Sequence, residues 1–151
     1  MKIIKFNFYK LKIYFLAIIF LQTSLFSTAV ISLENKIVLK IDNQIITSFD
    51  IKNEINYLTA LNPSLTKFDN NEIFEIAKKS IVQEKIKNIE ISNKFENTFV
   101  PQEYLKRLIK NIYLKIGIDD LENFKSYLKS KNVVYENVIS KIKTEALWNE
   151  L

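Results

Sequence analysis

Apolar and polar residues alternate over the stretch from residue 36 to residue 47. Ile37, Leu39 and Ile41 fall on one face of an extended chain, and the polar pair Asp42-Asn43 follows them. A period of two residues is typical of a β-strand, and a short polar pair is typical of a turn. The pattern therefore predicts a small β-hairpin whose second strand begins directly after the turn.

From there to the end of the chain, apolar residues recur every three or four positions, which is typical of amphipathic helices. Thr47 or Ser48 can cap the first helix, whose apolar stripe contains Ile51, Ile55 and Leu58. Polar and turn-forming residues separate the later segments. We therefore expect five helices, at about residues 48–61, 70–95, 101–116, 120–130 and 135–151.

Capping residues define several of these boundaries. The pairs Asp69/Glu72 and Asp119/Glu122 have the spacing of a capping box, in which each side chain accepts a hydrogen bond from the other residue's backbone. Pro101 suits the first position of a helix, and Gly117 suits the residue that ends one.

The predicted helix at residues 70–95 is apolar on successive faces, so it should lie centrally and contact different partners along its length. One side carries Ile73, Phe74, Ala77 and Ile81, and another carries Val82, Ile86 and Ile89. In the last two helices, the residues expected to face inward are Leu121, Phe124, Leu128, Val138, Ile139, Ile142, Ala146 and Trp148.

The composition agrees with a helical protein. Glycine occurs once and proline twice, which is too few turn formers for a sheet of many strands. The fold class predicted is mostly α: a short N-terminal β-hairpin followed by about five helices around one long central helix.

The first 29 residues have the organisation of a secretory signal peptide. Residues 1–12 are basic, Ile13–Phe26 is largely apolar, and Ser27-Thr28-Ala29 supplies small residues for cleavage after Ala29. The predicted domains are therefore a signal peptide at residues 1–29 and a helical domain at residues 30–151. A retained membrane anchor is the alternative, and both readings export the domain, which we expect in the periplasm.

The chemistry available to the chain is narrow. It has no cysteine and no histidine, which excludes thiol nucleophiles, imidazole bases and the usual zinc ligands. Asp119, Asp120 and Glu122 lack the spacing of a calcium loop, so no metal and no cofactor is predicted. Four of the 22 basic residues lie in the first 29 positions, which leaves 18 against 17 acids, so nucleic acid is not an expected partner.

Several segments, taken in order, resemble the N-terminal domain of the SurA-type periplasmic chaperones. The run from Ile37 to Ile51 is similar to that family's opening strand, turn and "I-T-x-x-D-hydrophobic" step. The segment 81–86 lies where the family has its long central helix, and Val100–Tyr104 resembles the start of the next helix. The segments 124–128 and 146–151 resemble its last two helices, so the similarity covers about residues 36–151.

The resemblance implies a chaperone domain that binds unfolded outer-membrane polypeptides or apolar peptides without ATP. Members of the family continue into parvulin-type prolyl isomerase domains and a C-terminal segment that packs on the helical domain. This chain ends where the first isomerase domain would begin, so no isomerase activity is carried over and no enzyme is predicted. The alternatives are a membrane-tethered scaffold, with membrane contact only through an uncleaved leader, or a truncated fragment of a longer isomerase.

Residues beside the predicted core stripes are the candidates for client contact. The broad apolar face of the helix from Pro101 to Ile116 could form one wall of an open groove, or bind a second copy or a separate isomerase partner. The alternative is that neighbouring helices cover this face on two sides. The candidate client-binding residues are Phe49, Tyr57, Leu61, Phe68, Tyr104, Leu108, Tyr113 and Tyr127.

Overall fold

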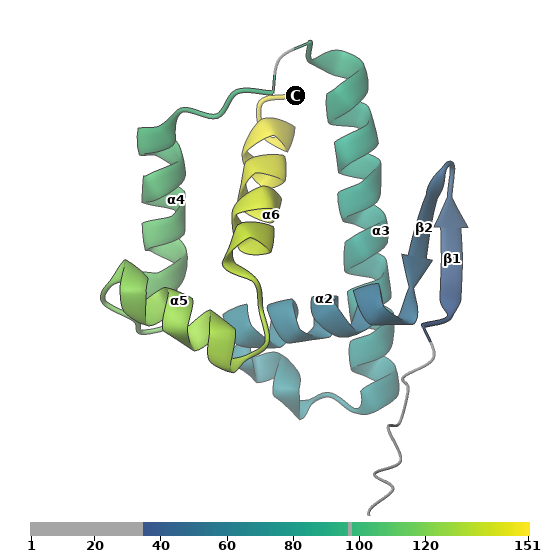
Figure 1. The fold of residues 1–151 in the computed structure, drawn as a ribbon, viewed down its shortest axis with the longest axis horizontal. Coiled ribbons are helices and arrows are strands. Elements are labelled where there is room, and N and C mark those ends of the chain that lie inside the picture. Colours follow the sequence, from purple (N-terminus) through teal and green to yellow (C-terminus); the bar gives the residue numbers. More distant parts are fainter. Residues whose placement is uncertain (1–34, 97) are drawn as a thin grey trace, which may run out of the picture. The chain divides into compact units, whose positions relative to one another are not determined.

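The computed structural model describes residues 35–96 and 98–151; the predicted signal peptide and its cleavage after Ala29 lie outside these residues. The described part is mostly helical, with a two-stranded antiparallel hairpin preceding five α-helices, so the predicted fold class is confirmed (Figure 1). The elements are β1 (Ile37–Ile41), β2 (Gln44–Thr47), α2 (Ser48–Leu61), the 3-10 helix η1 (Pro63–Lys67), α3 (Asn70–Lys94), α4 (Gln102–Lys115), α5 (Leu121–Ser130) and α6 (Tyr135–Trp148).

The hairpin forms where the alternation predicted it, with Asp42 in the left-handed conformation (φ 50°) at the turn. Leu39 pairs with Ile46, and Ile46 is fully buried. The register shifts between Ile37 and Leu39, so the prediction that Ile37 lies on the same face as Leu39 and Ile41 was wrong. A bulge adds a residue on one strand and reverses the side to which the preceding side chain points, and Ile37 is 67% exposed.

Two predicted helix starts are confirmed by their hydrogen bonds. Thr47 caps α2 in a capping box, in which its hydroxyl accepts from the Asp50 N–H at 3.2 Å and its own N–H donates to the Asp50 carboxylate at 2.8 Å. Asp69 caps α3 in the same way, and the Glu72 carboxylate accepts from the Asp69 N–H at 3.1 Å. Each box satisfies N–H groups that have no partner inside the helix.

The predicted start of the fourth helix was wrong by one residue. Asp120, not Asp119, is the N-cap of α5, and its carboxylate accepts from the Asn123 N–H at 2.8 Å. Because the helix begins at Leu121, that side chain lies at the exposed start of the first turn, with 37% of its surface accessible, and does not face inward as predicted. Phe124 and Leu128 are fully buried, as predicted.

Two helices end in the same hydrogen-bonded motif with different residues. After α4, Gly117 has φ 79°, and the Ile118 N–H donates to the Tyr113 carbonyl at 2.9 Å. After α5, Asn132 has φ 57°, and the Val133 N–H donates to the Leu128 carbonyl at 2.9 Å. This is the Schellman arrangement, which favours glycine or asparagine at the left-handed position.

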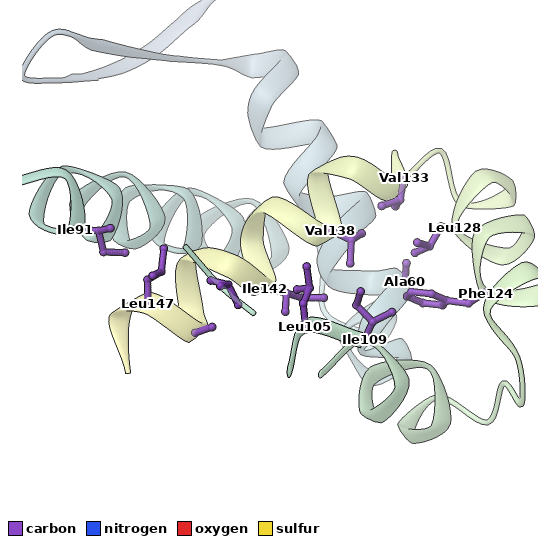
Figure 2. Close-up of a cluster of buried hydrophobic side chains, with 12 residues drawn as sticks. Ala60, Ile91, Leu105, Ile109, Phe124, Leu128, Val133, Val138, Ile142 and Leu147 are labelled. Atoms are coloured by element: carbon purple, nitrogen blue, oxygen red, sulfur yellow. The ribbon is translucent and has the colours of Figure 1, made fainter. Parts of the chain in front are cut away.

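The helices enclose two separate groups of buried side chains. In Figure 1, α6 lies between α3 and α4 and contacts both, while α2 packs against α3. We call the first group the main cluster; it joins α2, α3, α4, α5 and α6, and Figure 2 shows Phe124 beside Ala60 and Leu105 beside Val138. We call the second the hairpin cluster; its buried members are Ile46, Ile51, Ala77 and Ile81.

Helix α3 contributes to both clusters, as its drifting apolar stripe predicted. Ala77 and Ile81 belong to the hairpin cluster, whereas Ile91 belongs to the main cluster, where it faces Leu147 of α6. The prediction fails at Ile86, which is 46% exposed.

Candidate functional site

Three charged side chains from three helices meet beside the hairpin cluster. Lys141 of α6 pairs with Glu54 of α2 at 2.8 Å and also with Glu84 of α3. Glu54 is 4% exposed, and its second oxygen accepts from the Ser80 hydroxyl at 2.7 Å. No buried side-chain nitrogen or oxygen in the described residues is left without a hydrogen-bond partner. We call Glu54, Ser80, Glu84 and Lys141 the charge network.

The position of Glu54 in the sequence explains why this carboxylate is buried. It lies three residues after Ile51 and four before Leu58, on the face of α2 that packs against α3. A buried carboxylate is costly unless it is paired, and removing one partner of such a pair leaves an uncompensated charge. The charge network therefore fixes how α2, α3 and α6 fit together.

The Tyr57 ring packs against Lys141 of the charge network. The Lys141 ammonium lies 4.9 Å from the centre of the Tyr57 ring, within the range of a cation–π interaction. Burial raises the pKa of the Tyr57 phenol well above its usual value, and the negative charges of Glu54, Glu84 and Glu145 raise it further. Tyr57 therefore remains a neutral, amphipathic side chain at any physiological pH.

Two hollows open on either side of Tyr57 and Lys141, which line both. The larger one, here the polar hollow, has a volume of about 790 Å³ and lies over α2, α3 and the start of α6. Its lining includes the charge network's Glu54 and Glu84, several asparagines, and the apolar side chains Phe49 and Val134.

The smaller one, here the apolar hollow, has a volume of about 270 Å³ and lies between α2, α4 and α6. Its walls are formed by Tyr57, Tyr104, Leu108, Ile112, Ile142 and Ala146, and its polar lining by Asn111, Lys141, Glu145 and Asn149. Glu145 is held in place by Lys87, whose ammonium lies 2.6 Å from its carboxylate. An apolar floor with a polar rim is the usual composition of a protein surface that binds apolar groups.

The structure brings four of the eight predicted client-binding residues to these hollows. Tyr57, Tyr104 and Leu108 line the apolar hollow, all three half-buried, and Phe49 lines the polar hollow with 58% of its surface exposed. The α2 and α4 walls of the apolar hollow thus include residues singled out from the sequence, and the α6 wall does not.

The other four predicted residues lie elsewhere. Tyr113 packs on the Phe124 ring at 5.8 Å, and the Tyr127 hydroxyl donates to the Ala60 carbonyl at 2.9 Å, so both are parts of the main cluster. Leu61 also packs against that cluster. Phe68 is 45% exposed and lines neither hollow.

The broad apolar face of α4 is covered on two sides, as the alternative interpretation held, but not completely. Leu105 and Ile109 are buried, while Ile112 and Ile116 are partly covered by the main cluster. What remains open is the strip at Tyr104 and Leu108 that faces α6 across the apolar hollow.

The charge network was missed in the sequence, although one signal was present. Glu54 interrupts the apolar stripe of α2, and an acid within such a stripe indicates a buried partner. Its partners Glu84 and Lys141 lie on other helices and give no comparable signal.

Within the described part of the chain, no three side chains of the metal-binding types are placed to hold an ion. None of the helices found in residues 35–96 and 98–151 combines the length and the hydropathy that a bilayer span requires. No family model, curated protein or solved structure matches this chain. The SurA-type resemblance accordingly rests on the sequence motifs alone.

Proposed function

We propose that the helical domain is an ATP-independent periplasmic chaperone of SurA type, which binds unfolded outer-membrane polypeptides and keeps them from aggregating. The observation that carries the proposal is the apolar hollow between α2, α4 and α6, where Tyr57, Tyr104 and Leu108 are half-buried around an open apolar floor. The periplasmic location is proposed from the predicted leader, which lies outside the described residues. The class of client is proposed from the sequence motifs.

The composition of the hollow suits reversible binding of many different chains. Tyrosine offers a large contact area with few rotatable bonds, and its hydroxyl tolerates either water or a client's polar group. An open hollow of about 270 Å³ accommodates one or two apolar side chains rather than a folded domain. Such a site would favour the exposed apolar residues of an unfolded chain.

In this proposal the domain binds and does not catalyse. The Lys141 ammonium, the one cation that lines both hollows, is engaged by Glu54 and Glu84 together. An ammonium that is paired with two carboxylates is not free to attack a substrate.

The direct test is aggregation of a β-barrel outer-membrane protein diluted from urea, followed by light scattering with and without the purified protein. We expect near-stoichiometric protein to suppress scattering without ATP. Absence of suppression by protein that is folded by circular dichroism would refute the holdase proposal.

A pair of variants on one helix ties the activity to the apolar hollow. Leu108→Ser removes an apolar wall residue, whereas Leu114→Ser changes a leucine of the same helix that is 47% exposed and lines neither hollow. Losing one apolar contact of this size should weaken client binding about tenfold. We expect Leu108→Ser to require correspondingly more protein for suppression, while Leu114→Ser acts like the wild type.

A further inference from the structure

Asparagine side chains gather around the two hollows. Asn53, Asn56, Asn132 and Asn137 line the polar hollow, and Asn111 and Asn149 line the apolar hollow. Within residues 35–96 and 98–151, none of these six side-chain amides forms a hydrogen bond with the protein.

Some asparagines elsewhere in the described chain are engaged, whereas others on the surface, such as Asn71 and Asn93, form no side-chain hydrogen bond with the protein. The Asn62 side chain accepts from the Ser64 hydroxyl at 2.7 Å, and the Asn88 side chain accepts from the Thr144 hydroxyl at 2.8 Å. The Asn123 amide donates to the Asp120 carboxylate. The hollows are therefore lined by amides whose donors and acceptors are all available to a ligand.

The charges of the polar hollow cancel. Lys52, Lys85 and Lys141 are matched by Asp50, Glu54 and Glu84. A site without net charge gives no attraction to a phosphate backbone or to an anionic lipid surface, both of which require clustered basic residues. Its ligand is expected to be uncharged and rich in amide groups.

We infer that the two hollows form one site for an extended, uncharged polypeptide segment, in which the asparagine amides of the polar hollow bind the main chain and the apolar hollow takes the neighbouring apolar side chains. A peptide main chain presents one N–H donor and one carbonyl acceptor per residue, and an asparagine amide offers both complementary groups. The hollows meet at Tyr57 and Lys141, so one segment can reach both. This inference rests on the proposed holdase function and names the part of the client that is recognised.

Recognition of the main chain does not depend on sequence, which is the property that a chaperone with many clients needs. The side chains would then add affinity only where an apolar residue reaches the hollow between α4 and α6. An uncharged run followed by an apolar residue should therefore bind better than either feature alone.

The test is a titration calorimetry comparison of two short capped peptides in which leucine alternates with serine. One has an ordinary main chain, and in the other the serine amides are N-methylated, which removes donors and leaves the side chains unchanged. The protein variants are the double substitution Asn56→Ala with Asn137→Ala, and as matched control Asn71→Ala with Asn93→Ala, two helical asparagines outside both hollows. Alanine is favoured in helices, so neither pair threatens folding; Asn132 is left unchanged because its φ is positive.

We expect the Asn56/Asn137 variant to bind the ordinary peptide on the order of tenfold more weakly than the wild type does. Because the variant lacks the amides that would bind the main chain, its affinity for the methylated peptide should be little lower than its affinity for the ordinary one. The control pair should bind both peptides like the wild type. Equal affinity of the Asn56/Asn137 variant and the wild type for the ordinary peptide would overturn the inference, as would a dimer whose formation requires these asparagines. The light-scattering result is independent: suppressed aggregation without peptide binding would overturn this inference alone, and peptide binding without suppression would overturn the holdase proposal.

Discussion

The main cluster and the hairpin cluster differ in how completely their apolar side chains are covered. The main cluster draws on five helices and includes the fully buried Phe124, whose ring packs against both Tyr113 and Tyr135. The hairpin cluster has only isoleucine and alanine fully buried, and beside it Ile37, Ile45 and Phe49 remain more than half exposed. Two strands cannot cover an apolar surface as helices packed from several sides can.

The two clusters therefore differ in what holds the neighbouring helices in place. The charge network lies where α2, α3 and α6 meet, and it provides a directional link beside a cluster that has few large side chains. Stability should therefore come mainly from the main cluster, and the correct fit of α2 on α3 and α6 mainly from the charge network.

The largest effect is expected in the main cluster, at Phe124. Phe124→Ala leaves a cavity where a fully buried ring was, and such substitutions cost about 4 kcal/mol. Urea denaturation should show this loss without a change in the slope. A loss below about 1 kcal/mol would mean that the main cluster is not the principal source of stability.

The next largest effect is expected from Lys141→Met, which leaves Glu54 buried without its cation. Breaking a buried ion pair costs about 3 kcal/mol, whereas replacing both partners is nearly neutral. The double variant Glu54→Leu with Lys141→Met should therefore be more stable than Lys141→Met alone, by urea denaturation. If the double variant is less stable than Lys141→Met, then the Glu54 carboxylate stabilises the fold even without its cation, which would contradict this account.

Ile46→Ala should cost less, about 2 kcal/mol, because the hairpin cluster lies near the surface and can partly collapse. Amide hydrogen exchange of the Ile46→Ala variant shows which part of the chain is destabilised. We expect faster exchange for amides of β1, β2 and the start of α2, and unchanged exchange in α4 and α5. Faster exchange throughout would mean that the two clusters unfold as one unit.

The smallest effect concerns pH. The pKa of Tyr57 is raised in the folded state, so the unfolded chain loses this proton first as pH rises. Its contribution to stability is therefore full below pH 10, the ordinary value, and is lost as pH rises above it. Tyr57→Phe keeps the ring and removes the proton, so its stability should decline less steeply above pH 10 in urea denaturation than that of the wild type. Identical slopes would contradict the burial of this phenol.

Features that depend on neighbouring residues could be predicted from the sequence. The capping box at Asp69 and the helix end at Gly117 were correct because each depends on residues within a few positions. The predictions that failed concern positions where two adjacent residues could play the same part, or where the outcome depends on residues far away in the sequence. Asp119 and Asp120 offer two caps side by side, and the structure uses Asp120.

The same division applies to the candidate site. Tyr57, Tyr104 and Leu108 could be singled out because they flank clear apolar stripes. Of the charge network, only Glu54 gives a signal in the sequence, because its partners Glu84 and Lys141 meet it only after three helices have packed.

The central proposal is that an unfolded client occupies the hollow between α4 and α6, and site-specific photo-crosslinking tests it most directly. A photoreactive residue at Asn111 lies in the lining of the apolar hollow, whereas one at the adjacent Lys110 is exposed and outside both hollows. We expect an unfolded β-barrel protein to crosslink strongly at position 111 and weakly at position 110. Equal crosslinking at the two positions, or crosslinking at 110 alone, would contradict a client site in this hollow.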